Sequence, residues 1–152
     1  MSRKTLSDDS LLTFVQDQLN KTGVDPSRIV LELTETAAAE NIPQATAFMN
    51  GLREMGFRFA LDDFGVGFSS FGALRRWPVD YVKIDGSFIR DLRHDPANQH
   101  WVKAMVDAAR GLDKRIVAEF VPDEPTLDLL RTYGVHYGQG YYIGPPRPVG
   151  DP

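Results

Sequence analysis

Short apolar segments alternate with longer amphipathic ones along this chain. The segments 28–34, 58–63, 81–84 and 115–120 are rich in β-branched and other apolar residues, as buried strands are, and 137–143 is expected to be a fifth strand. Apolar residues recur at helical spacing in 8–19, 42–55, 99–111 and 124–133, and shorter helical segments are expected at 70–76 and 88–92. This alternation predicts parallel βαβ units, and therefore an α/β sheet or barrel.

The number of strands leaves two architectures open. Five strands could form a small doubly wound sheet, whereas a complete eight-stranded barrel needs roughly 250 residues, and this chain has 152. A barrel would therefore be incomplete here. We expect one domain over residues 1–146 and an unstructured tail over 147–152, because Pro145, Pro146 and Pro148 disfavour regular structure.

Composition excludes several classes of protein. A hydrophobic content of 42% and a charged content of 25% are typical of a soluble globular domain. The net charge of -4 argues against a polymeric nucleic-acid partner. No cysteine is present, so metal ligands must be oxygen or histidine. No apolar run long enough for a membrane span or a signal peptide occurs, and we expect this piece to be cytoplasmic.

Charged residues fall where the expected strands end. Each is flanked by apolar residues, so its charge would be costly to bury without a partner or a metal. Because the carboxyl ends of parallel strands converge on one crevice, these side chains should meet there. They are Glu32, Asp62, Asp63, Lys83 and Glu119.

Such a cluster is suited to one kind of chemistry. Carboxylate oxygens favour magnesium or manganese over zinc or copper. Enzymes that catalyse in-line attack of water on a phosphodiester commonly use two such ions. Hydrolysis of a phosphate ester is therefore the activity that these residues fit best.

Each of these residues also has an ordinary explanation when taken alone. A single strand-end glutamate, such as Glu32 or Glu119, is often an ion-pair partner or a helix cap. Asp62 and Asp63 stand before Phe64-Gly65, a sequence typical of a turn. Lys83 by itself would be read as an ion-paired lysine whose stem is buried. The metal-site hypothesis therefore depends on the whole set.

Five motifs, in order, resemble those of the EAL domain family. They are Glu32-Leu33-Thr34-Glu35, the stretch from Asp62 to Ser70 (DDFGVGFSS), the stretch from Asp80 to Asp85 (DYVKID), Ala118-Glu119, and Gln139-Gly140-Tyr141. Their order and spacing match over nearly the whole chain, from about Leu6 to Pro146.

The resemblance implies a modified (β/α)8 barrel that hydrolyses cyclic di-GMP to the linear dinucleotide with Mg²⁺ or Mn²⁺. It implies that Glu32, Asp62 and Asp63 are metal ligands, that Lys83 orients water or phosphate, and that Glu119 is the general base. Gln139 would bind substrate in the same site.

The resemblance also implies a regulatory loop and partners. Glu35 would brace the loop 63–70, which in the family couples the metal site to a dimer interface. A homodimer is therefore expected, and an upstream sensory or GGDEF domain is a possible further part of the protein.

Two departures from the family's pattern stand out. The Glu-Ala-Leu segment that names the family does not occur among these 152 residues, nor does the asparagine ligand that normally precedes the stretch like Ser2 to Leu6. Pro122 stands where the family usually has a second glutamate. We therefore expect this fragment to bind metal weakly and to be inactive by itself. The alternatives are a degenerate, non-catalytic cyclic di-GMP receptor and a dimerisation module.

Overall fold

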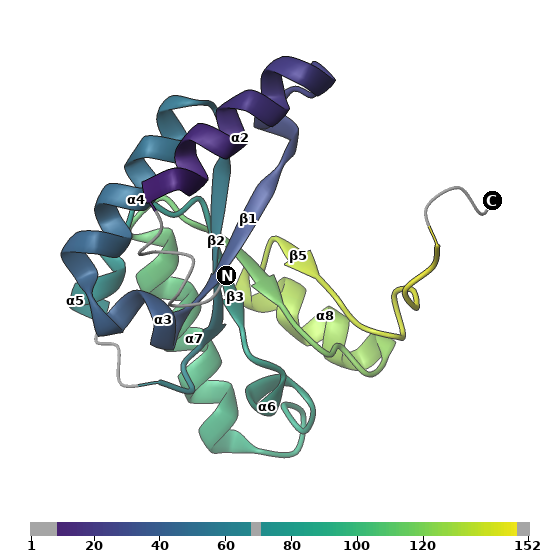
Figure 1. Ribbon diagram of the computed structural model, residues 1–152. Helices are drawn as coiled ribbons and strands as arrows, with labels where there is room; N and C mark the ends of the chain where they lie inside the picture. Colours follow the sequence, from purple (N-terminus) through teal and green to yellow (C-terminus); the bar gives the residue numbers. More distant parts are fainter. Residues whose placement is uncertain (1–8, 68–70, 149–152) are drawn as a thin grey trace. The chain divides into compact units, whose positions relative to one another are not determined.

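The computed structural model describes residues 9–67 and 71–148. The chain divides into two compact units, Met1–Tyr81 and Val82–Pro152. Each unit contains strands and helices that alternate along the chain (Figure 1).

The first unit is built on a parallel pair of strands. β1 (Val30–Thr34) and β2 (Arg58–Phe64) pair in a register that places Val30 opposite Arg58 and Thr34 opposite Asp62. α3 packs on both strands and on α4, and both helices lie on one side of the pair (Figure 1). The helices of this unit are α2 (Asp9–Thr22), the 3₁₀ helix η1 (Pro26–Arg28), α3 (Glu35–Glu40), α4 (Ile42–Glu54) and α5 (Phe71–Leu74).

Side-chain caps explain how the chain turns from β1 into helices. Thr34 ends β1, and its hydroxyl accepts a hydrogen bond from the N–H of Ala37 at the start of α3. Asn41 does the same for the N–H of Gln44 in α4, where Pro43 occupies the first turn. The six-residue helix α3 is absent from the sequence predictions, because it is too short to show a periodic pattern.

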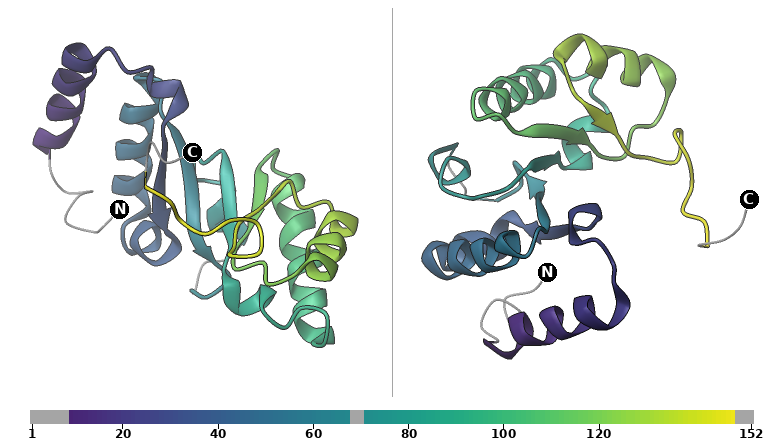
Figure 2. Two further views of the ribbon diagram at one scale, coloured as in Figure 1. Left: turned by 90° about the vertical axis from the view of Figure 1, so that its right-hand side faces the viewer. Right: turned by 90° about the horizontal axis from the view of Figure 1, so that it is seen from above.

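The second unit begins within β3 (Tyr81–Ile84), whose first residue closes the first unit. β4 (Arg115–Ala118) pairs in parallel with β5 (Tyr137–Gly138), and the N–H of Glu119 donates to the carbonyl of Ile84 at 3.2 Å. α7 and α8 lie on the same side of the β4–β5 pair (Figure 2, right). The helices of this unit are α6 (Gly86–Ile89), α7 (Pro96–Arg110) and α8 (Glu124–Tyr133).

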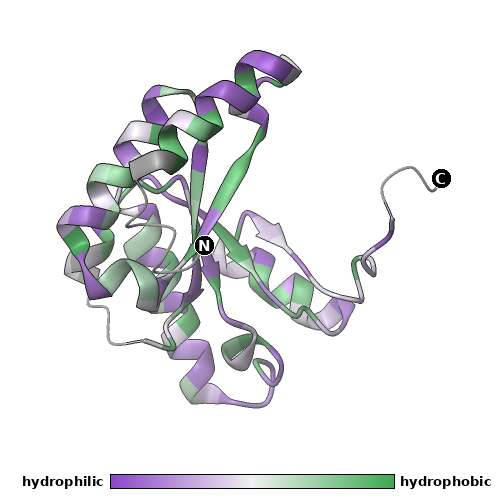
Figure 3. Ribbon diagram, in the orientation of Figure 1, coloured by the Kyte–Doolittle hydropathy of each residue, from purple (hydrophilic) through white to green (hydrophobic). Residues whose placement is uncertain are grey.

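Apolar residues from both strands and helices are buried in each unit. In the first, the buried set includes Leu33, Met49, Leu52, Phe59 and Leu61. In the second, it includes Ile84, Val102, Val106, Ile116 and Leu130. The longer helices carry purple and green segments in turn, as amphipathic helices do (Figure 3).

Most predicted elements occur, with differences at their ends. β3 and α8 have the predicted bounds. The strand predicted from residue 28 begins at Val30, because Asp25 caps η1 and its carboxylate accepts the N–H of Ser27. α7 starts earlier than predicted, at Pro96, because Asp95 caps it. Of the helix predicted at 70–76, residue 70 lies outside the described residues, and α5 covers Phe71–Leu74.

Two strand predictions were too long. β4 ends at Ala118, so Glu119 and Phe120 lie beyond it. The strand predicted at 137–143 is limited to the two residues of β5. The N–H groups of Ile143 and Gly144 both donate to the carbonyl of Gly140, which turns this part of the chain. Helix α6 likewise spans Gly86–Ile89 rather than 88–92.

Candidate metal and catalytic site

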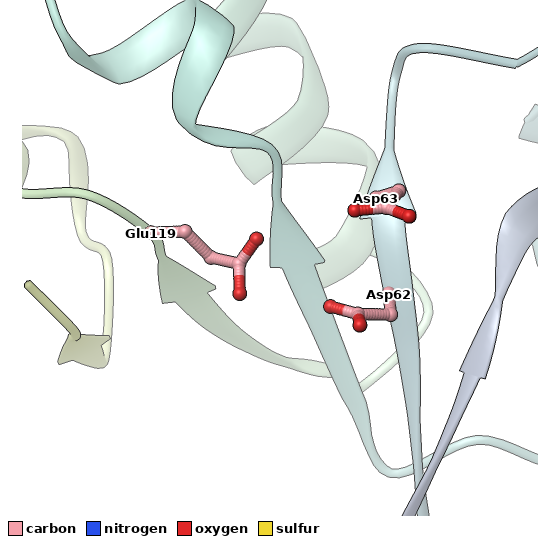
Figure 4. A group of neighbouring side chains, drawn as sticks. All are labelled: Asp62, Asp63 and Glu119. Carbon is pink, nitrogen blue, oxygen red and sulfur yellow. The ribbon is translucent and has the colours of Figure 1, made fainter. Parts of the chain in front are cut away.

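Asp62 and Asp63 lie near the end of β2, directly before its last residue Phe64, and the backbone between them lets both carboxylates serve one site. Successive residues of a strand point to opposite faces. Asp63, however, has a φ of 55°, in the left-handed region. This turn ends the alternation, and carboxylate oxygens of the two residues lie within 4.8 Å of one another. Figure 4 shows both side chains at the end of β2.

The left-handed turn at Asp63 has a modest cost. A non-glycine residue in this region costs roughly 1–2 kcal/mol, although aspartate and asparagine adopt it more readily than most. Backbone strain of this kind is concentrated at functional sites. Asp62 is partly buried and Asp63 is exposed, so a ligand could reach the latter from solvent.

Glu35 holds the loop that follows this pair of carboxylates. The residue is 1% exposed, and its Oε2 accepts hydrogen bonds from the N–H groups of Gly65 at 2.9 Å and Gly67 at 3.4 Å. A Cβ on Gly67 would lie 3.2 Å from the Glu35 carboxyl carbon, so glycine allows this close approach. Residues 68–70 of the loop lie outside the described part of the chain.

Glu32 does not occupy the position that the sequence predicts. It is the third of the five residues of β1 rather than the last, and its side chain is exposed rather than enclosed by apolar neighbours. The apolar residue beside it, Leu33, faces the core on the other side of the strand. The register places Glu32 opposite Ala60, two positions from Asp62 on the adjacent strand.

Lys83 and Glu119 form a buried ion pair in the second unit. Nζ of Lys83 lies 2.8 Å from Oε1 of Glu119, and the two residues are 6% and 8% exposed. The N–H of Glu119 is fixed by the carbonyl of Ile84, at the end of the strand that carries Lys83. Here the expectation of a buried, paired charge is correct. Figure 4 shows the Glu119 side chain directly after β4.

The backbone around Glu119 is anchored on both sides. The N–H of Gln139 donates to the carbonyl of Ala118 at 2.8 Å, and the N–H of Val121 donates to the carbonyl of Gln139 at 3.0 Å. A Cβ on Gly140 would lie 2.6 Å from the backbone nitrogen of Val121, so this approach requires glycine. Main-chain hydrogen bonds therefore hold Gln139 next to the segment that carries Glu119.

A pocket of about 530 Å³ opens beside Glu119 within the second unit. This volume is in the range of small-molecule sites. Gln139 lies in the pocket wall, and its role as a substrate-binding residue stays a prediction. The pocket is lined by Glu119, Phe120, Gln139, Gly140, Tyr141, Gly144, Pro145 and Pro146.

Phe120 is a site residue that the sequence analysis missed. It follows Glu119, lines the pocket, has a φ of 55° and is 49% exposed. No sequence pattern marks a phenylalanine in the left-handed region, so this position could be found only from the backbone. Pro122, two residues further on, is exposed and offers neither a carboxylate nor an N–H group.

The donor chemistry fits a hard divalent cation. Asp62 and Asp63 offer oxygen ligands, which magnesium and manganese prefer. An acidic group that could hold a metal ion is therefore present in this chain.

The comparison with protein families agrees with this chemistry. The EAL domain model matches residues 1–146. The chain belongs to the EAL domain family. The resemblance deduced from the five motifs is thereby confirmed, and the family is metal-dependent.

Curated relatives of this EAL chain are named as phosphodiesterases. It is 39% identical over 149 residues to the cyclic di-GMP phosphodiesterase PdeB of Shewanella oneidensis, covering 98% of this chain and 17% of that protein. It is 41% identical over 130 residues to the cyclic di-GMP phosphodiesterase PdeL of Escherichia coli, covering 86% of this chain and 36% of that protein. The chain thus spans a minor part of these relatives.

Solved structures confirm the fold class. A PaMucR phosphodiesterase structure in complex with c-di-GMP matches with a TM-score of 0.92 and 34% identity, covering 98% of this chain and 60% of that one. The FimX EAL domain of Pseudomonas aeruginosa, bound to c-di-GMP, matches with a TM-score of 0.92 and 30% identity, covering 99% and 62%. The five parallel strands and their helices are therefore those of the barrel-like EAL fold.

Proposed function

We propose that this chain carries metal-binding and catalytic residues of a domain that hydrolyses cyclic di-GMP to the linear dinucleotide. The observation that carries the proposal is the buried Lys83–Glu119 pair, of which Glu119 lines a ligand-sized pocket. Burying an ion pair adds little to stability, because desolvation offsets most of the attraction. A function in the pocket explains the pair better than folding does. Membership of the EAL family supplies the substrate.

Each side chain then has a defined role in the proposed reaction. Glu119 would accept a proton from the water that attacks phosphorus, as a general base does. The ammonium of Lys83 compensates the carboxylate charge and holds it in one orientation, and it can also donate to a phosphate oxygen. One phosphorus–oxygen bond forms and one bond to a ribose 3′-oxygen breaks, which opens the ring. Gln139 would contact the substrate from the pocket wall.

The proposed cofactor is Mg²⁺ or Mn²⁺, held by Asp62, Asp63 and Glu32. When bound, such ions activate water and neutralise charge on the phosphate. Glu32 is exposed and Asp63 is at the loop, so neither needs a core rearrangement to bind a cation. Glu35 would keep Asp63 in place through its hydrogen bonds to the following loop.

The test is hydrolysis of cyclic di-GMP by this chain together with whatever coding sequence precedes Met1 in its gene. We expect turnover with Mg²⁺ or Mn²⁺ when a Glu-Ala-Leu segment is present, and none from the 152 residues alone. Glu119→Gln should lower turnover by about 10²-fold or more. Lys83→Ala should also slow turnover but leave metal binding largely intact. The matched control is Glu124→Gln, an exposed glutamate at the start of α8.

A receptor function is the second candidate, and Pro122 favours it. The family usually has a carboxylate at this position, and proline cannot bind a metal there. A protein that binds cyclic di-GMP but hydrolyses it with neither metal would contradict the catalytic proposal. In that case Pro122→Glu is the first reversion to examine, because restored hydrolysis would locate the defect.

The family also suggests partners, which we propose separately from the reaction. They are a homodimer and an upstream sensory or GGDEF domain, in a cytoplasmic setting. Among the described residues no helix has the length and apolar character needed to cross a membrane. Light scattering at several protein concentrations tests the homodimer, and a monomer at every concentration would contradict it.

A further inference from the structure

Glu119 depends on contacts with the β3 segment for its position. β4 ends at Ala118, so Glu119 lies beyond the strand, although a general base must be placed accurately to act. Its N–H donates to the carbonyl of Ile84 at 3.2 Å, and its Oε1 lies 2.8 Å from Nζ of Lys83. Both contacts join Glu119 to the end of β3.

The next residue, Phe120, contacts the segment that follows β3 through its ring. The guanidinium carbon of Arg90 lies 4.6 Å from the centroid of the ring, within the range of a cation–π contact. Gly86 lies so close that an added Cβ would overlap Cδ2 of the ring and stand 2.7 Å from Cγ. Gly86 is the first residue of α6 and Arg90 follows its last, so the ring packs against a single helical turn.

This helical turn is linked firmly to β3. The side chain of Asp85 caps α6 by accepting a hydrogen bond from the N–H of Ser87 at 2.8 Å. The N–H of Arg90 donates to the carbonyl of Gly86 at 3.0 Å, which closes the turn. Lys83 lies three positions before Gly86, so a short, hydrogen-bonded segment joins the lysine to the surface that the ring contacts.

Folding alone explains Phe120 poorly. Its φ of 55° is in the left-handed region, which favours glycine. The residue is 49% exposed, so the ring gains only part of the stabilisation that a buried phenylalanine has. Glycine would adopt this backbone with less strain, but it would lack the ring that contacts α6. Strain of this kind is concentrated at functional sites.

We propose that Phe120 is a positioning residue, whose ring, packed against Gly86 and Arg90, keeps the carboxylate of Glu119 in place beside Lys83. Phe120 then acts through Glu119 rather than on the substrate. Its loss should slow the chemical step without weakening substrate binding. The catalytic consequence rests on the proposed function, whereas support of the ion pair by the ring does not.

NMR of the Lys83 ammonium tests this support without any measurement of activity. The ¹⁵Nζ signal is identified by its absence from the double variant Lys83→Met with Glu119→Met. We expect slow hydrogen exchange with water in the wild type and in Phe120→Tyr, which keeps the ring. Phe120→Gly and Gly86→Ala, which remove or displace the ring, should both lose the slowly exchanging signal.

A matched control separates local loosening from global unfolding. The amide hydrogens of α7 should keep their exchange rates in both variants, because they report opening of the whole unit. Wild-type Lys83 exchange as fast as that of surface lysines would overturn the proposal. Unchanged exchange at Lys83 in Phe120→Gly, or equal acceleration at Lys83 and α7, would overturn it as well.

Steady-state kinetics supply the second measurement, with the chain extended by the coding sequence that precedes Met1. Phe120→Gly and Gly86→Ala should lower kcat by up to about 10²-fold, the loss that a misplacement of about 1 Å can cause, with little change in KM. Phe120→Gly suits the left-handed backbone, so it keeps the test valid if Gly86→Ala is unstable. Phe120→Tyr should retain the wild-type kcat.

The kinetic control is Trp101→Ala, which removes an exposed aromatic side chain from α7 and should leave kcat unchanged. A rise in KM alone in Phe120→Gly would contradict positioning. Loss of slow Lys83 exchange in Phe120→Gly, with no hydrolysis by the wild type, would retain the ring as the support of the ion pair and reject the phosphodiesterase function. Wild-type hydrolysis that Phe120→Gly leaves unchanged would reject the positioning role alone.

Discussion

At the residue scale, single backbone angles place two of the candidate functional side chains. Asp63 and Phe120 both have a φ of 55°, and each adjoins a candidate functional carboxylate, Asp62 and Glu119 respectively. The carboxylate oxygens of Asp63 and Asp62 lie within 4.8 Å of one another, and Phe120 lines the pocket with its ring against Gly86 and Arg90. In both cases the backbone adopts a strained conformation, and that conformation determines where the side chain lies.

The Lys83–Glu119 pair predicts a clear separation of stability from activity. Lys83→Ala leaves a buried carboxylate without its charge partner, which should cost about 3–5 kcal/mol in the free energy of unfolding. The double variant Lys83→Met with Glu119→Met should recover most of that loss, because two apolar side chains need no charge compensation. Urea denaturation checks this, and equal stability of Lys83→Ala and the wild type would contradict it.

Gly86 and Phe120 should be energetically coupled. Gly86→Ala places a methyl group where the Phe120 ring lies, so we expect the melting temperature to fall. In a Phe120→Gly background the same substitution should be tolerated, since the ring is gone. A double-mutant cycle measures the coupling. If the effects of Gly86→Ala and Phe120→Gly on the melting temperature were additive, the Phe120 ring would be able to move away from residue 86 without cost, and the coupling would be absent.

At the element scale, aspartate caps fix where helices begin. Asp95 caps α7 and Asp123 caps α8, the helix that follows the Glu119 segment. Hydrogen bonds from Thr126, with a further contribution from Arg93, hold the pKa of Asp123 below its usual value. Arg93 lies 3.4 Å from the Asp123 carboxylate. The cap is therefore stronger when Asp123 is ionised.

This cap predicts a pH dependence of stability. Because the folded-state pKa is depressed, the ionised cap stabilises the protein above the unfolded pKa of about 3.9 and loses this effect as pH falls through the folded value. Asp123→Asn keeps a capping side chain but removes the charge. The urea midpoint of the wild type should exceed that of Asp123→Asn at pH 7, and the gap should narrow by pH 3.

The exposed Asp128 provides a control for this experiment. It pairs with Arg131 on the surface of α8 at 2.7 Å, with both side chains more than half exposed. Asp128→Asn should therefore change the midpoint little at either pH. A gap between wild type and Asp123→Asn that does not vary with pH would contradict the charged cap.

At the scale of the whole molecule, metal binding tests the carboxylates together. Mn²⁺ should raise the melting temperature of the wild type slightly, because a ligand that binds only the folded state stabilises it. Asp62→Asn with Asp63→Asn should abolish this shift, whereas Asp107→Asn, an exposed position on α7, should not. We expect weak binding, and calorimetry that finds two tightly bound ions in the 152-residue chain would contradict this expectation.

The sequence by itself determined the family and most of the alternation of strands and helices, and it supplied the candidate site residues, whose roles stay predictions. Hydrophobic periodicity located β3 and α8 at their observed bounds, because these elements have both a regular pattern and clear end signals. The burial of Lys83 and Glu119 also followed from their apolar neighbours. Local patterns suffice for such features, since they depend on neighbours along the chain.

Only the tertiary structure decided which residues depart from strand geometry and what they contact. The exposure of Glu32, the short β5 and the left-handed Phe120 depend on hydrogen bonds and packing between residues far apart in the sequence. The contact of Phe120 with Gly86 joins positions 34 residues apart, and no periodic pattern encodes it. Alternation along a strand predicts which face of the sheet each side chain points to. The residue at which a strand ends depends instead on the hydrogen bonds that the following backbone groups make with other parts of the chain.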